Sequence, residues 1–122
     1  QKTIKDDIEL VICAIPSSRE GLEETSIRVT AKKLCQGSII DGTSCIIRKY
    51  TVPKKHDGGY RDIEKEIDSL SLQNKHIIKN KIVVVLDDIT TSGVSMKAAI
   101  KILEDAGAKK VYGFAIAKTS EY

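Results

Sequence analysis

The feature that most constrains the fold is the uninterrupted apolar run from Ile82 to Leu86, which is made almost wholly of β-branched residues. Such residues pack well in strands, and a run without polar alternation predicts a strand covered on both faces. A second apolar run, Leu10 to Ile15, ends at Pro16 and predicts another buried strand. Both runs are far shorter than the roughly 20 residues that cross a bilayer. We therefore expect a sheet at the centre of the molecule.

The rest of the chain alternates between helical and extended patterns. Apolar residues at helical spacing predict helices over residues 27–35, 60–70 and 96–103. Residues 45–49 predict a short strand, and the run 111–117 predicts another buried strand. Strands that alternate with helices in this order predict an α/β fold, a three-layer and mainly parallel twisted sheet flanked by helices. At this length we expect one domain over residues 1–122.

Composition excludes several classes of protein. The net charge of +3 is spread along the chain, without the basic patch of a nucleic-acid binder, and no signal peptide or membrane span is visible. Cys13, Cys35 and Cys45 form no CxxC pair, so we expect reduced thiols, no disulfide, no zinc site and a cytoplasmic location. The chain opens with Gln1 rather than Met, which leaves open a missing upstream piece.

Two adjacent acids, Asp87 and Asp88, follow the central strand, where open α/β sheets place their ligands. The next turn, Thr90 to Ser95, is rich in hydroxyls, contains Gly93 and leads into a helix. The first turn of a helix carries unpaired N–H groups and a partial positive charge, so this segment predicts an anion cradle.

Carboxylates beside a phosphate would repel it unless the ligand also has hydroxyl groups. A ribose 5-phosphate resolves the conflict, because its 2- and 3-hydroxyls donate to Asp87 and Asp88 while the phosphate occupies the cradle. An ordinary helix start capped by acids stays open as an alternative on these residues alone.

The segment Val83 to Ser95 (VVVLDDITTSGVS) closely resembles the signature of type I phosphoribosyltransferases, which bind phosphoribosyl pyrophosphate (PRPP). The resemblance implies the fold core of that family and ribose contacts by Asp87 and Asp88, with Asp88 also among the catalytic residues. Thr91 matches a position that is acidic in the purine-salvage branch, so a general base there is not implied. The 5-phosphate contacts implied are those of Thr91, Ser92, Gly93, Val94 and Ser95.

Other segments extend this resemblance over most of the chain. The loop after the first strand, with Ser17, Ser18 and Arg19, occupies the place of the family's pyrophosphate loop. The stretch IIRKYTVPKKHDGG (46–59) resembles the mobile catalytic loop of orotate phosphoribosyltransferases, which closes over the pyrophosphate. Lys54 competes with Lys55 for the second lysine position. The catalytic residues implied there are Arg48, Lys49, Lys55 and His56, the last a candidate proton donor. The chain ends soon after its last strand, as in ComF-like members of the family.

The reaction implied is displacement of pyrophosphate from PRPP by a nitrogen nucleophile, a nucleobase or amine. Mg²⁺ would bind through PRPP oxygens, with Asp87 and Asp88 as further candidate ligands. Dimers are usual in that family, although the sequence carries no interface signature of its own. A non-catalytic PRPP-sensing or ComF-like module stays open as the alternative. A phosphoacceptor receiver is disfavoured, because nothing acidic follows Ile15.

Overall fold

The computed structural model describes residues 9–16, 26–50, 63–88 and 93–116. Its strands are β1 (Leu10–Ala14), β2 (Ile40–Asp41), β3 (Ile46–Arg48), β4 (Leu70–Leu72), β5 (Ile82–Asp88) and β6 (Lys110–Ile116). Its helices are α1 (Ser26–Leu34), α2 (Ile63–Ser69) and α3 (Val94–Asp105), with a short 3-10 helix, η2 (Lys75–Ile77). Four strands form one sheet in the order β2-β1-β5-β6, and β3 pairs with β4 in a second sheet.

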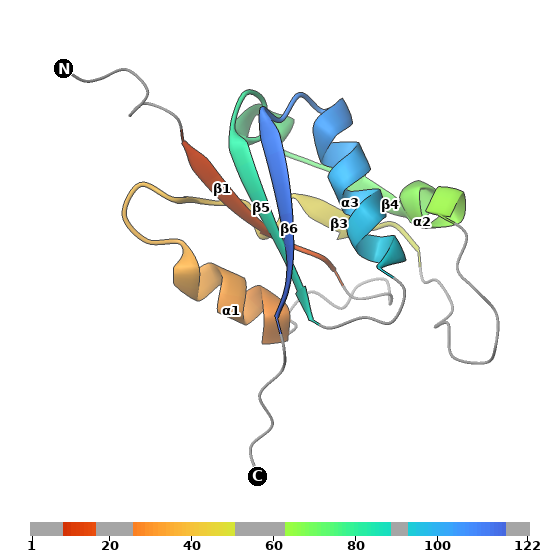
Figure 1. Cartoon of the computed structure of the whole chain (residues 1–122), viewed down its shortest axis with the longest axis horizontal. Helices are drawn as coiled ribbons and strands as arrows, with labels where there is room; N and C mark the ends of the chain where they lie inside the picture. The colour runs from red at the N-terminus through yellow and green to blue at the C-terminus, as the bar shows by residue number, and fades with distance from the viewer. Residues whose placement is uncertain (1–8, 17–25, 51–62, 89–92, 117–122) are drawn as a thin grey trace, which may run out of the picture.

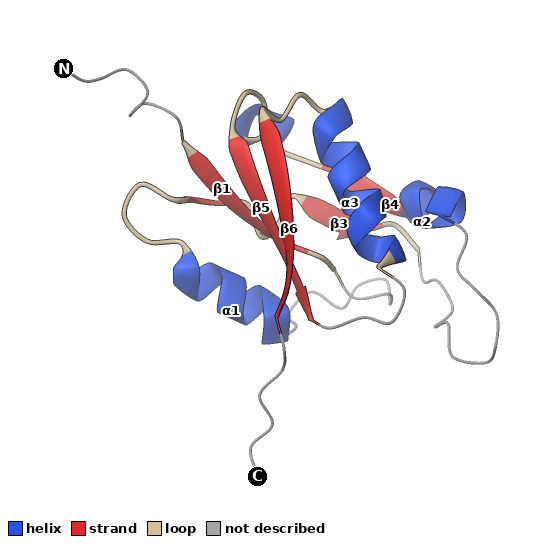
Figure 2. Ribbon diagram, viewed as in Figure 1, coloured by secondary structure: helices blue, strands red, loops and turns tan. Residues whose placement is uncertain are grey.

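The large sheet is parallel throughout, and helices flank it (Figure 1; Figure 2). The α1 helix contacts one face, while α3 packs on the other face with α2 beside it. This is the mainly parallel α/β sheet that the sequence predicted. None of the helices that the described residues form is long and apolar enough to cross a bilayer.

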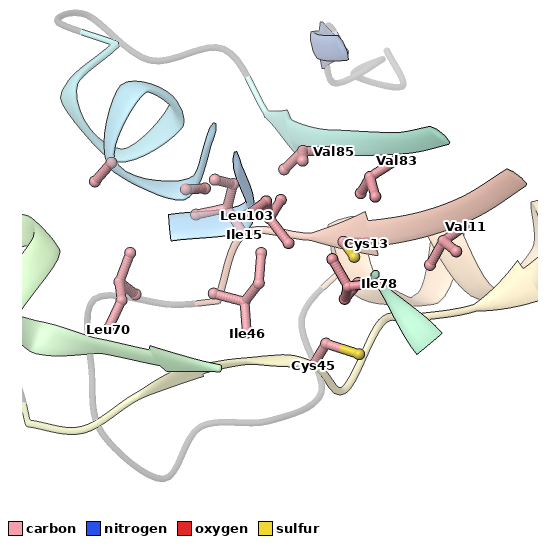
Figure 3. Close-up of a cluster of buried hydrophobic side chains, with 12 residues drawn as sticks. Val11, Cys13, Ile15, Cys45, Ile46, Leu70, Ile78, Val83, Val85 and Leu103 are labelled. Carbon is pink, nitrogen blue, oxygen red and sulfur yellow. The ribbon is translucent and has the colours of Figure 1, made fainter. Parts of the chain in front are cut away.

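Alternation along the strands divides the core into two clusters. Odd-numbered residues of β1 and β5, among them Cys13 and Val85, face α3 and pack with its Leu103. Even-numbered residues such as Ile12 and Leu86 face α1. Figure 3 shows Ile46 and Leu70 of the small sheet pointing into the first cluster, so the antiparallel pair covers the α3 face of the large sheet beside α3.

The structure corrects two predicted boundaries. Leu70 was predicted to continue the helix of Ile63 and Ile67, but it opens β4 and pairs with Arg48 of β3. The N–H of Lys49 donates to the carbonyl of Ser69 over 2.7 Å, and this bond extends the pairing of the two segments. The strand predicted to end at Leu86 continues through both acids to Asp88.

Gly113 in β6 allows the first turn of α3 to lie close to the sheet. A Cβ atom at residue 113 would lie 2.5 Å from Sδ of Met96 and 3.3 Å from Cδ1 of Ile100. We therefore expect Gly113→Val to lower the free energy of unfolding by about 1–3 kcal/mol in urea titrations, because overpacking displaces side chains. Ala115→Val adds bulk at an exposed position of the same face and should change stability by less than about 0.5 kcal/mol. Equal losses in the two variants would contradict this close packing.

Candidate functional site

The candidate site lies where β1 and β5 end side by side. The chain leaves these two strands in opposite directions: α1 and β2 follow β1 toward one edge of the sheet, and α3 and β6 follow β5 toward the other. Such a reversal of strand order is the place where open α/β sheets bind ligands, beyond the carboxyl ends of the strands. The two ends are level, because Ala14 pairs with Leu86 and the N–H of Ile15 donates to the carbonyl of Leu86 over 3.0 Å.

The predicted ribose-binding acids occupy this edge. Asp87 and Asp88 are the last two residues of β5, paired with Ala115 and Ile116 of β6. Asp87 lies on the same face as Val85, the face that α3 covers, and its side chain is buried, with 7% exposed. The structure describes the backbone of Asp88 and not its side chain. Burial strengthens the interaction of a carboxylate with any hydroxyl that reaches it.

The N-terminus of α3 supplies the positive end of a helix dipole near these acids. Gly93 precedes the helix with a φ of 73°, a left-handed conformation that glycine adopts without a steric penalty. The first turn of α3 contains no acidic residue. An anion at this end would therefore meet the helix dipole and the N–H groups of the first turn.

Part of the predicted phosphate site falls within the described residues. Gly93 caps α3, and the helix begins at Val94, two residues before the predicted start, so that Val94 and Ser95 lie in its first turn. Seven other predicted site residues lie outside the described ranges, so their positions stay predictions: Ser17, Ser18, Arg19, Lys55, His56, Thr91 and Ser92.

The structure places Arg48 differently from the sequence prediction. The resemblance implied that Arg48 belongs to a mobile loop that closes over the pyrophosphate. In the structure Arg48 ends β3 and is buried, with 5% exposed. Its Nη1 donates to Oε2 of Glu66 over 3.0 Å and to Oγ of Ser69. In this enclosed position the attraction between guanidinium and carboxylate is stronger than it would be between the same groups at an exposed turn. Lys49, the next predicted cation, is exposed.

Glu66 is the site residue that sequence reasoning missed. Its side chain is fully buried, and its Oε2 accepts hydrogen bonds from Arg48 and, over 2.8 Å, from Oγ of Ser95 in the first turn of α3. The signal was present, because Glu66 lies three residues after Ile63 and one before Ile67, on the apolar stripe of α2. We call Arg48, Glu66, Ser69 and Ser95 the Glu66 cluster.

Further contacts tie the chain after β3 to α2. The hydroxyl of Tyr50 donates to Oδ2 of Asp68 over 2.6 Å, and this bond raises the pKa of Tyr50 above its ordinary value. With the bond from Lys49 to the carbonyl of Ser69, three consecutive residues at the end of β3 are held by the last turn of α2.

The remaining titratable residues point to no second site. Among the described residues, no three His, Cys, Asp or Glu side chains gather in a way that would hold a metal ion. Cys13 and Cys45 are buried free thiols, and Cys35 is a partly buried one. His76, predicted as a surface residue, is exposed in η2.

Comparison with known proteins relates the chain to a protein family. The model of the phosphoribosyl transferase domain family matches residues 7–119. Searches of curated proteins and of solved structures returned no match.

Proposed function

Because the chain belongs to the phosphoribosyl transferase domain family, we propose that it binds PRPP at the carboxyl ends of β1 and β5 and transfers the phosphoribosyl group to a nitrogen nucleophile. The observation that carries the proposal is the order of elements where the strand order reverses: two acids end β5 at the carboxyl edge of the sheet, and the next element, α3, begins at Val94. A small ligand with both hydroxyl groups and a phosphate suits this edge, because the hydroxyls can donate to the acids and the phosphate can bind at the N-terminus of α3.

In this proposal each element of the edge has one task. Asp87 and Asp88 accept hydrogen bonds from the 2- and 3-hydroxyls of ribose. The backbone at Gly93, Val94 and Ser95 receives the 5-phosphate at the positive end of α3. Rigid strands hold the acids in place before the ligand arrives, so little ordering remains to be done on binding.

Departure of pyrophosphate leaves negative charge that cations must neutralise. We assign this task to Arg19, Lys49 and Lys55, which the resemblance places around the leaving group, with His56 as proton donor. Arg48 is not among them, because its guanidinium is enclosed with Glu66. The residues that surround the leaving group also exclude water, which would compete with the acceptor as nucleophile.

A divalent cation fits this edge of the sheet. Carboxylate oxygens are the ligands that Mg²⁺ prefers in proteins, and Asp87 ends β5 at the site. Since the described residues form no cluster of three potential ligands, we propose that most ligands come from PRPP itself. When bound, Mg²⁺ neutralises charge on the pyrophosphate oxygens.

The proposal is tested by titrating the chain with PRPP and Mg²⁺ in a calorimeter and then measuring pyrophosphate release with a panel of nucleobases and amines. We expect saturable PRPP binding, and release that requires one acceptor of the panel. Binding without release for any acceptor would favour the non-catalytic PRPP-sensing module. Absence of PRPP binding would overturn the proposed site.

A further inference from the structure

The Glu66 cluster joins three elements that are distant in sequence. Arg48 comes from β3, Glu66 and Ser69 from α2, and Ser95 from the first turn of α3. The two ions are almost completely enclosed, with 3% and 0% of the side chains of Arg48 and Glu66 exposed. A buried pair carries a large desolvation penalty and often adds little net stability, so stability alone is a weak explanation for it.

We propose that Glu66 is a positioning residue for the 5-phosphate site and acts through the hydroxyl of Ser95. The inference rests on the proposed function and deepens it, because no feature of the sequence had assigned Glu66 a role. The bond of 2.8 Å from Oγ of Ser95 to Oε2 of Glu66 fixes the second residue of α3 against α2. The start of α3 is thereby held at one distance from the acids that end β5.

The number of protons that a serine hydroxyl can donate supports a positioning role for this bond. A hydroxyl has a single proton, and that of Ser95 goes to Glu66. Toward a phosphate the oxygen would then present lone pairs, which repel an anion. We therefore assign the 5-phosphate contact of Ser95 to its backbone N–H, and the hydroxyl to the anchoring of the helix start.

Arg48 makes a carboxylate at this position compatible with phosphate binding. An uncompensated negative charge behind the first turn of α3 would oppose a dianionic ligand, since unit charges within a Debye length interact appreciably. The bond of 3.0 Å between Nη1 of Arg48 and Glu66 neutralises that charge. Ser69 completes the arrangement, because its hydroxyl accepts from Arg48 and donates to the carbonyl of Glu66 over 2.8 Å.

The experiment measures ribose 5-phosphate affinity, because this probe lacks the pyrophosphate that Arg48 was first predicted to contact. The variants are S95A, the apolar pair R48M/E66M, and the triple variant that combines them. Replacing both partners of a buried ion pair by apolar residues of similar volume usually preserves the fold. We expect S95A and R48M/E66M each to weaken binding about tenfold, and the triple variant to bind within about twofold of R48M/E66M.

This non-additivity separates positioning from a merely structural role. If the hydroxyl of Ser95 donated to the phosphate, S95A would weaken binding equally in both backgrounds. If Glu66 only supported the fold, S95A would leave the affinity unchanged. Either result would overturn the inference. Unchanged affinity in a folded R48M/E66M would overturn it too. Glu64→Gln, which removes the same charge from an exposed position of α2, is the matched control and should bind as the wild type does.

Two further measurements cover the remaining outcomes. Should R48M/E66M fail to fold, E66Q replaces it. The neutral amide oxygen of glutamine accepts a weaker hydrogen bond from Ser95 than a carboxylate does. S95A should therefore reduce ribose 5-phosphate affinity less in the E66Q background than in the wild type. An undiminished effect of S95A there would overturn the inference. A wild-type chain that binds neither ribose 5-phosphate nor PRPP would instead overturn the proposed function itself.

Discussion

The variant D87N/D88N is expected to lose about ten- to a hundredfold in PRPP affinity while keeping its fold. Each asparagine retains the shape of the side chain but replaces a charged acceptor with a neutral one. Hydrogen bonds to charged groups contribute about 1.5–3 kcal/mol each, roughly twice the neutral value, so two weakened bonds to ribose account for a loss of this size. Isothermal titration calorimetry with PRPP and Mg²⁺ measures it.

The matched control is Asp105→Asn at the far end of α3. Asp105 is exposed and pairs with Lys101 over 3.5 Å, so its replacement removes a carboxylate without touching the carboxyl edge of the sheet. We expect PRPP affinity within about twofold of the wild type, because exposed pairs contribute little. Unchanged PRPP affinity in D87N/D88N would remove the ribose assignment, and thermal melts distinguish lost binding from lost structure.

The second large effect concerns stability. Arg48→Met is expected to lower the free energy of unfolding by about 3–5 kcal/mol, because it leaves the fully buried carboxylate of Glu66 without its cation. Chemical denaturation measures the change as a shift of the urea midpoint at constant slope.

The control for this prediction is the paired variant R48M/E66M, which removes both charges. It should recover most of the stability lost by R48M, since burying two apolar side chains leaves no unpaired ion. If R48M alone were as stable as the wild type, the carboxylate of Glu66 would have another means of compensation, and the interpretation of this ion pair as mutually dependent would be wrong.

The sequence contained the information for the large sheet. The apolar runs of β1 and β5 predicted buried strands because nothing polar interrupts them, and the periodicity of α3 predicted its buried face. The acids and the glycine at the site were also found from sequence, because their positions follow from the ends of those elements. The same reasoning was wrong for β6, which was predicted to be buried: it lies at an edge of the sheet and exposes Tyr112 and Phe114.

The edge strand β2 of the large sheet, the strand β4 of the small sheet and the Glu66 cluster could not be found in this way. The strands β2 and β4 are two and three residues long, too short to show alternation, and only pairing with a neighbour makes them strands. Arg48 belongs to a segment whose resemblance to a mobile catalytic loop implied an open position, and its enclosure depends on Glu66, which follows 18 residues later. Contacts between residues so far apart produce no periodic pattern in the sequence. A glutamate on the apolar stripe of α2 did indicate a buried charge, which requires a partner.

The enclosed ion pair also gives the molecule a temperature dependence of a particular sign. Hydration of charged groups becomes less favourable on warming, so the desolvation of Arg48 and Glu66 costs less in hot solution, whereas hydrophobic stabilisation reaches a plateau. The junction of β3, α2 and α3 should therefore weaken least as the molecule is heated.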